Sequence, residues 1–253
     1  NTKGKITLNL LKLLKINYTI VRKNSDLIKF NKQIKNAKRN KKIVACLIEQ
    51  GTFEKSKKKV IRKNFYNFSK ILFLKTLLET INKDTKIISS TGYNSRELLQ
   101  LRNKYNFKKS KDFYMVGGMG HTSSVALGCS LFSNKNIICI DGDGSLLMHL
   151  GSIKTVATFA NKNFKYILLN NNSHDSVGGQ NTYSNYIDFQ KLSKSLGFKR
   201  FYSIKDKNDL KKKIKRFLTG GSLDFLEVKI SNTSVKNLPR PGNLIKIKNL
   251  FMK

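Results

Sequence analysis

The chain has 253 residues, and 50 Lys and Arg against 15 Asp and Glu give it a formal net charge of +35. Such a balance ordinarily points to nucleic acid or to an anionic surface as the partner. The lysines are nevertheless spread over almost every polar stretch, and no RNP, helix-turn-helix or zinc-finger pattern accompanies them, which argues against a specific nucleic-acid partner.

The three cysteines, Cys46, Cys129 and Cys139, lie in apolar stretches without the spacing of metal ligands. We expect them to be reduced, small buried residues rather than a disulfide or metal framework, as in a cytoplasmic protein. No apolar run approaches the length of about 20 residues that crosses a membrane, so no membrane association is expected.

The first 53 residues carry the pattern of only part of an α/β domain. Two helix-like stretches and one or two strand-like runs, the last ending in "IEQGTF", do not suffice to close a sheet. We therefore expect residues 1–53 to be the C-terminal remnant of a larger domain. The basic stretch at residues 54–63 is predicted to be a linker between domains.

From residue 64 to residue 253, helical and strand-like patterns alternate. Apolar residues at helical spacing cover 65–81, and "KIISS" then indicates a buried strand. Asn94 and Glu97 form a capping-box pattern that predicts the start of the next helix. Because the alternation continues to the last strand-like run, we expect an α/β domain whose parallel sheet is flanked by helices on both faces.

The tripeptide Gly142-Asp143-Gly144 follows one predicted strand, and Asn170–Asn172 follow the next. One predicted helix, "SLLMHLGSIKTVATFA", and one strand lie between them, so both motifs should meet at the carboxyl edge of the sheet, where such folds bind ligands. Carboxylate, amide and carbonyl oxygens suit Mg²⁺ that also holds substrate phosphates. Gly142 permits a turn, and Gly144 lets backbone N–H groups approach an anion. The pattern predicts a magnesium-bridged diphosphate site.

At these residues the chain resembles the thiamine-diphosphate-dependent 2-keto acid decarboxylases, whose cofactor motif is Gly-Asp-Gly followed by paired asparagines at about this spacing. The resemblance runs from about Ala45 to the C-terminus, and it is strongest to the phosphonopyruvate decarboxylases in "STGYNSREL", "VGGMGHTSSVALG", "DGDGSLLMHLGS" and "LLNNNSHDSVGGQNTY". It implies thiamine diphosphate and Mg²⁺ as cofactors. It also implies decarboxylation of 3-phosphonopyruvate to phosphonoacetaldehyde and CO₂.

The same resemblance implies roles for individual residues. Asp143 and Asn171 would ligate Mg²⁺ through their side chains, and Ser173 would do so through its carbonyl. Met119 would wedge between the two cofactor rings, and the carbonyl of Gly117 would accept a hydrogen bond from the cofactor's amino group. Further cofactor contacts are expected from Thr91, Gly92, Gly142, Gly144 and Ser145. Asn172 replaces a glycine of the family pattern, which we expect to be tolerated because Asn reaches left-handed backbone conformations readily.

Three residues are candidates for catalysis or substrate contact: His121, His174 and Asp175. His121 follows a glycine-rich loop at a predicted helix start, where it could donate a proton or equally be a cap with its ring in solvent. His174 and Asp175 directly follow the metal-binding motif, and we expect them to close over the substrate. His149 is expected to be a packing or surface residue.

Two features of the family bear on partners. A glutamate near the beginning of its pyrimidine-binding domain activates the cofactor, and its active sites lie between domains of different subunits. No matching glutamate is found in this sequence, so the resemblance implies either a homo-oligomer or a separate pyrimidine-domain chain as partner. Two alternative functions stay open: the diphosphate-binding subunit of a sulfopyruvate decarboxylase, and a catalytically silent cofactor-binding or assembly subunit.

Overall fold

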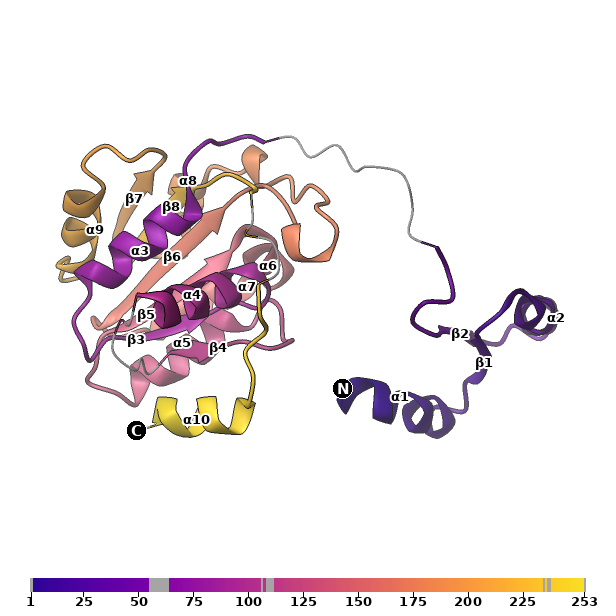
Figure 1. The fold of residues 1–253 in the computed structure, drawn as a ribbon. Coiled ribbons are helices and arrows are strands. Elements are labelled where there is room, and N and C mark those ends of the chain that lie inside the picture. The colour runs from indigo at the N-terminus through magenta and orange to yellow at the C-terminus, as the bar shows by residue number, and fades with distance from the viewer. Residues whose placement is uncertain are drawn as a thin grey trace. The chain divides into compact units, whose positions relative to one another are not determined.

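A computed structural model describes residues 2–54, 64–105, 107, 112–233, 235 and 238–252, without the side chains of residues 2, 3 and 5. The chain divides into two compact units, residues 1–59 and 60–253, which are treated separately below (Figure 1). Apart from Glu54, the predicted linker lies outside the described residues. The division into remnant, linker and complete domain stays a prediction.

In the first unit, the described residues 2–54 form two helices and a two-stranded parallel sheet. Its elements are α1 (Thr2–Leu13), β1 (Asn17–Val21), α2 (Asn24–Arg39) and β2 (Val44–Ile48). None of the residues of α2 is buried, and β2 is only half-buried. Two strands offer too little apolar surface for an independent core, so this unit by itself is marginal.

The second unit is built on a six-stranded sheet in the order β4-β3-β5-β6-β8-β7. All of its strand pairs are parallel, which confirms the predicted fold class. The strands are β3 (Lys86–Ser89), β4 (Phe113–Tyr114), β5 (Ile137–Gly142), β6 (Phe164–Asn170), β7 (Arg200–Ile204) and β8 (Asp224–Lys229). Every residue of β6 is buried, as expected for a central parallel strand covered on both faces.

Helices cover both faces of this sheet (Figure 1). The helices are α3 (Lys70–Thr80), α4 (Tyr93–Lys104), α5 (Thr122–Leu131), α6 (Asp143–Met148), α7 (Gly151–Phe159), α8 (Phe189–Leu196), α9 (Leu210–Leu218) and α10 (Leu244–Met252). One core cluster collects buried residues of α3, α4 and α9, and the other collects those of α5, α7 and α8. Along β5, Ile138 and Ile140 join the first cluster whereas Ile137 and Cys139 join the second, since alternate side chains of a strand point to opposite faces.

Two predictions about helices are wrong. The single helix predicted after Gly144 is interrupted, because α6 ends at Met148 and α7 begins at Gly151. The capping box is also wrong, because α4 already begins at Tyr93 with Gly92 as its N-cap. Asn94 instead donates a hydrogen bond from Nδ2 to the Oγ of Ser90, at 3.0 Å.

The order of the strands creates a switch point between β3 and β5. The chain leaves β3 through α4 toward β4 on one side, whereas it leaves β5 through α6 and α7 toward β6 on the other. Ligands of parallel sheets bind outside the carboxyl ends of the strands at such a point. The loops that follow β3, β5 and β6 therefore frame the expected binding position.

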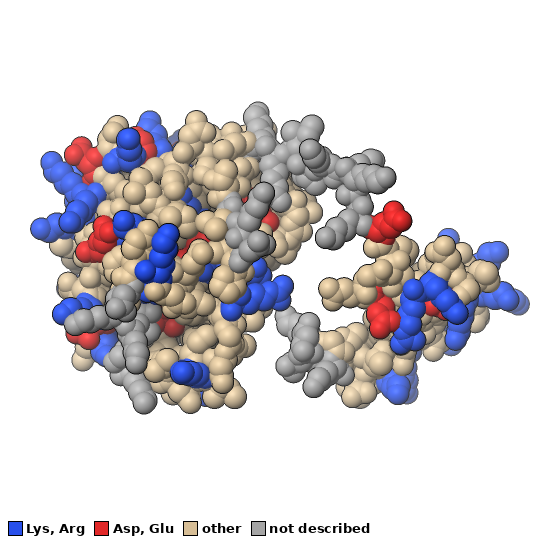
Figure 2. All heavy atoms as spheres, in the orientation of Figure 1, with Lys and Arg blue, Asp and Glu red and all other residues tan. Residues whose placement is uncertain are grey.

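Figure 2 shows Lys and Arg side chains scattered over the visible surface of each unit, in keeping with the even spread of basic residues along the chain. Among the described residues, no helix has the length and apolar character that a membrane span requires.

Candidate functional site

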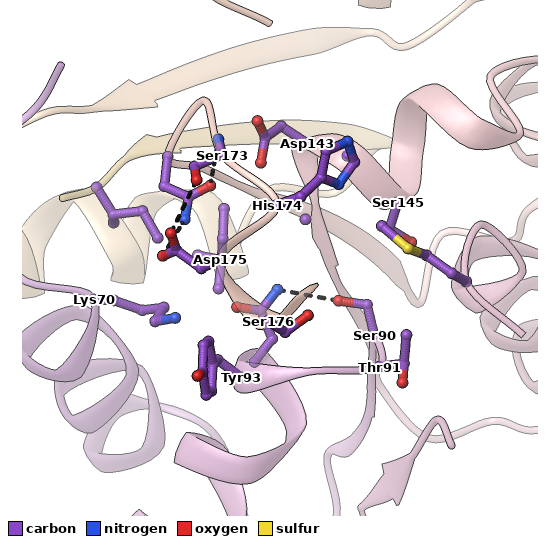
Figure 3. A pocket seen from close by; sticks show the side chains of 17 residues that line it. Lys70, Ser90, Thr91, Tyr93, Asp143, Ser145, Ser173, His174, Asp175 and Ser176 are labelled. Carbon is purple, nitrogen blue, oxygen red and sulfur yellow. Dashed lines mark hydrogen bonds between the residues drawn. The ribbon is translucent and has the colours of Figure 1, made fainter. Parts of the chain in front are cut away.

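A pocket lies at the carboxyl edge of the sheet, at the switch point (Figure 3). Its walls come from the residues that follow three strands: Ser90 and Thr91 after β3, the stretch Gly142–Ser145 at the end of β5, and part of the loop after β6. Lys70 of α3 contributes a further wall. The fold therefore brings the two sequence motifs together as predicted.

Most of the residues singled out in the sequence line this pocket. They are Thr91, Met119, Gly142, Asp143, Gly144, Ser145, Asn171, Ser173, His174 and Asp175. Gly92, Gly117 and His121 are not among the lining residues. Gly92 is the N-cap of α4 and His121 that of α5, and Gly117 has a φ of +74° in the preceding loop. The chemical roles of all these residues stay predictions.

Asp143, the first residue of α6, is 2% exposed. Its Oδ2 accepts hydrogen bonds from the hydroxyls of Thr182 and of Ser184, the latter at 2.9 Å. Burial raises the pKa of Asp143, while these hydrogen bonds oppose the shift. Among the described residues no Lys or Arg forms an ion pair with it. A buried carboxylate held only by neutral donors at a pocket wall suits a bound divalent cation, which would offset the cost of burial.

Of the three consecutive asparagines, Asn171 is the one that lines the pocket. Asn170 ends β6 and donates from Nδ2 to Oε1 of Glu227, at 2.7 Å. Asn172 lies in the left-handed region with a φ of +56°, as expected from its replacement of a glycine, and its Oδ1 accepts from the backbone N–H of Asn185. Asn171 is therefore the candidate metal ligand, whereas its two neighbours form hydrogen bonds that hold the loop in place.

The loop after β6 folds back as a short hairpin. Ser173 and Asn181 form an antiparallel bridge, and the backbone N–H of His174 donates to the carbonyl of Gln180 at 2.8 Å. The return brings Thr182 and Ser184 onto Asp143. The loop that carries Asn171 is thus fastened to the helix that carries Asp143, so both candidate ligands are held in one assembly.

Backbone groups at the edge of the pocket favour an anion. Gly92, the N-cap of α4, has no side chain to cap the first N–H groups of this twelve-residue helix, whose Tyr93 and Asn94 line the pocket. Free N–H groups at a helix start attract phosphate. At the beginning of α6, a Cβ on Gly144 would overlap the ring of His174, so a larger residue there would force this ring to shift.

The sequence did not reveal the buried ion pair that closes one end of the pocket. Nζ of Lys70 lies 2.9 Å from Oε2 of Glu97, and their side chains are 4% and 0% exposed. Burial raises the pKa of Glu97; the ammonium of Lys70 lowers it, and the charge of Asp175 raises it further. In the sequence nothing distinguishes Lys70 from the other basic residues, because its pairing depends on the packing of α3 against α4.

The three histidines of the chain all lie around α6. His174 lines the pocket beside Gly144. His121 and His149 are exposed and stack edge to face, with ring centroids 4.7 Å apart. His149 is thus a surface residue that also contacts His121.

A second buried carboxylate lies just behind the pocket. Asp141 of β5 is 1% exposed and accepts hydrogen bonds from the hydroxyl of Tyr166, at 3.0 Å, and from the backbone N–H of Gly142, at 2.9 Å. Burial raises its pKa to about 6, although these hydrogen bonds favour the charged form. Asp141 therefore takes up a proton more readily in the folded chain than in the unfolded one.

Comparison with known proteins adds to this geometry. Residues 90–228 match the family model for the thiamine pyrophosphate enzyme, C-terminal TPP binding domain. The chain is 34% identical over 173 residues to phosphonopyruvate decarboxylase of Streptomyces viridochromogenes, which covers 68% of this chain and 42% of that protein. It is 31% identical over 183 residues to sulfopyruvate decarboxylase subunit beta of Methanococcus maripaludis, which covers 71% of this chain and 93% of that subunit.

The chain thus spans less than half the length of the phosphonopyruvate decarboxylases it matches and nearly all of the matched sulfopyruvate decarboxylase subunit. Its fold also matches that of a Mycobacterium smegmatis protein classed as a thiamin diphosphate-dependent enzyme, with a TM-score of 0.52 over 77% of this chain and 37% of that one. At 16% identity this match shows the fold alone.

The contact between Gly144 and His174 can be tested by substitution. Gly144→Ala should lower the free energy of unfolding by about 1–3 kcal/mol, because the new methyl group displaces the imidazole or the backbone. Urea denaturation measures the change. Gly128→Ala is the matched control: its Cβ would meet nothing within 4 Å in α5, so it should raise stability by about 0.5–1 kcal/mol. Equal effects of the two substitutions would contradict the close approach.

Asp141 predicts a pH dependence of stability. Because its folded pKa of about 6 lies above the unfolded value near 3.8, its stabilising contribution is complete below about pH 4 and is lost as the pH rises through 6. The free energy of unfolding of Asp141→Asn relative to the wild-type chain should therefore rise by about 3 kcal/mol between pH 4 and pH 7. Urea denaturation without divalent cations measures this difference. A difference that does not vary with pH would refute the raised pKa.

Proposed function

We propose that this chain, which belongs to the thiamine pyrophosphate enzymes through its C-terminal TPP binding domain, supplies the diphosphate- and metal-binding part of a 2-keto acid decarboxylase. The observation that carries the proposal is the meeting of buried Asp143 with Asn171 in a pocket at the switch point of the parallel sheet. The sequence relatives support decarboxylation as the reaction.

The residues present fit a magnesium ion and a diphosphate. The carboxylate of Asp143, the amide oxygen of Asn171 and the carbonyl of Ser173 would hold Mg²⁺, whose remaining positions suit phosphate oxygens. Diphosphate would lie between the start of α4 and the backbone around Gly144 and Ser145. When bound, thiamine diphosphate supplies the electron sink that 2-keto acid decarboxylation requires.

Other residues of the chain would orient the cofactor and manage protons. Met119 lines the pocket, where its flexible apolar side chain would support the cofactor rings. His174 lies against Gly144 at the same wall and would hold or move a proton near the diphosphate end. His121, in the exposed ring pair, is the candidate for contact with the substrate.

A partner chain or a second copy would complete the active site. The loop that carries the candidate metal ligands, together with the end of α6, exposes large apolar side chains. They are Met148, Val177, Tyr183 and Tyr186, with exposed fractions between 60% and 81%. Apolar side chains gathered next to a polar pocket favour a protein interface there. The matched beta subunits support the same conclusion, since a beta subunit implies at least one other.

The cofactor site can be tested by calorimetric titration with thiamine diphosphate. Binding should require Mg²⁺, and Asp143→Ala should weaken it by more than about 100-fold, because it removes the only carboxylate of the proposed ligand set. Asp188→Ala is the control, since Asp188 caps α8 and lies outside the pocket. Binding that is indifferent to Mg²⁺ and to Asp143 would overturn the proposal.

The substrate is proposed to be 3-phosphonopyruvate, which would yield phosphonoacetaldehyde and CO₂. Similarity to phosphonopyruvate decarboxylases over 68% of the chain supports this choice. Sulfopyruvate is the second candidate, because the chain spans 93% of a sulfopyruvate decarboxylase beta subunit.

Release of CO₂ from each keto acid, measured on the chain assembled with its partner, separates the two. We expect a higher kcat/KM for phosphonopyruvate; the reverse order would assign the chain to sulfopyruvate, and release from neither would favour a cofactor-binding subunit without activity.

A further inference from the structure

We infer that Asp175 is a positioning residue that sets the orientation of two proposed metal ligands, an inference that rests on the proposed function. It replaces the expectation that Asp175 closes over the substrate. The observation behind it is that Asp175 uses both of its carboxylate oxygens on the residues Asn171 and Ser173 (Figure 3).

The two hydrogen bonds are short and separate. Asn171 donates from Nδ2 to Oδ2 of Asp175 at 2.8 Å, and Ser173 donates from Oγ to Oδ1 at 2.9 Å. Asp175 is 7% exposed, so little water competes for either oxygen. Hydrogen bonds to a buried carboxylate are stronger than those between neutral groups. The carboxylate therefore fixes its donors more firmly than a neutral side chain would.

Asp175 determines which end of the Asn171 side-chain amide faces it. An asparagine amide presents an oxygen and an NH₂ group of nearly the same shape, and only its partners decide which way it faces. An ionised carboxylate accepts hydrogen bonds and donates none, so Asp175 selects the NH₂ end. Oδ1 of Asn171 is thereby turned away from Asp175, as a metal ligand requires.

The oxygen of this amide keeps capacity for a cation. Oδ1 of Asn171 accepts the backbone N–H of Ser173 at 3.1 Å, which uses one of its two lone pairs. The second lone pair can ligate Mg²⁺. With the two bonds to Asp175, this contact closes a ring through Asn171, Asp175 and Ser173. The amide oxygen and the Ser173 backbone are therefore fixed relative to each other.

A buried ion pair borders the same pocket. Lys70, in its ion pair with Glu97, lines the pocket together with Asp175. Hydrogen bonds from two donors favour the charged form of a carboxylate. Both oxygens of Asp175 accept hydrogen bonds from Asn171 and Ser173, the two proposed metal ligands. Its influence on the reaction would pass through the metal.

The test measures metal affinity directly, with Mn²⁺ as the probe. Free Mn²⁺ is followed by electron paramagnetic resonance during titration of the full chain in the presence of thiamine diphosphate. Asp175→Ala should weaken Mn²⁺ binding by about 10- to 100-fold, the usual effect of losing a group that orients a ligand. Asp188→Ala serves as the control for the same β6–α8 segment and should leave the affinity unchanged.

Asp175→Asn removes the charge of residue 175 and keeps a side chain that can form both hydrogen bonds. Its Oδ1 can accept from Asn171, and its NH₂ group can donate to the Oγ of Ser173, whose hydroxyl then acts as acceptor. Because its hydrogen bonds are neutral and its amide can face either way, it should recover only part of the affinity lost in Asp175→Ala. Circular dichroism checks that each variant is folded, and the asparagine variant keeps the test decisive if the alanine variant is not.

Three outcomes would overturn the inference. Unchanged affinity in Asp175→Ala would show that the ligands need no such support. Affinity as weak in Asp175→Asn as in Asp175→Ala would show that hydrogen bonding to Asn171 and Ser173 does not carry the effect. Absence of Mn²⁺ binding in the folded wild-type chain would refute the proposed function itself, and the inference would fall with it, whereas the first two outcomes leave that function intact.

Discussion

The candidate site depends on one constraint: the carboxylate of Asp143 is buried without a cationic partner among the described residues. Burial of an ionised group is costly unless hydrogen bonds or a counter-charge offset the loss of water. Thr182 and Ser184 offset part of this cost. Their position in turn requires that the loop after β6 return to α6. The return of the loop therefore lowers the cost of burying this carboxylate.

Parallel topology makes this arrangement possible. Consecutive strands joined by one crossover end at the same edge, so β5 and β6 deliver their terminal residues side by side. Every residue of β6 is buried, and Asn170 at its end donates a hydrogen bond to Glu227 of the neighbouring β8. Asn171 therefore starts from a well-defined position before its own side chain makes any contact.

The sequence was sufficient for the fold and for the central motif, because both are encoded locally. Strand and helix alternation predicts the sheet, and the glycines and asparagines mark strand ends that must coincide. Contacts between segments distant in the chain could not be read in this way. The pair Lys70–Glu97 joins two helices, and the hydroxyls of Thr182 and Ser184 reach Asp143 only through the fold of the loop. The wrong capping box at Asn94 has the same origin: the helix start at Gly92 is set where the chain leaves β3, at the edge of the pocket.

The base and the tip of the hairpin that follows β6 differ in how freely their sequences can change. Its base, from Asn171 and Ser173 to Thr182 and Ser184, is tied to Asp143 and to its own ring of hydrogen bonds. Its tip carries Val177, which is 69% exposed. Insertions or deletions at the tip would leave the distances at the base unchanged. A lineage could therefore remodel the surface that a partner or substrate meets while the metal-binding residues stay in register.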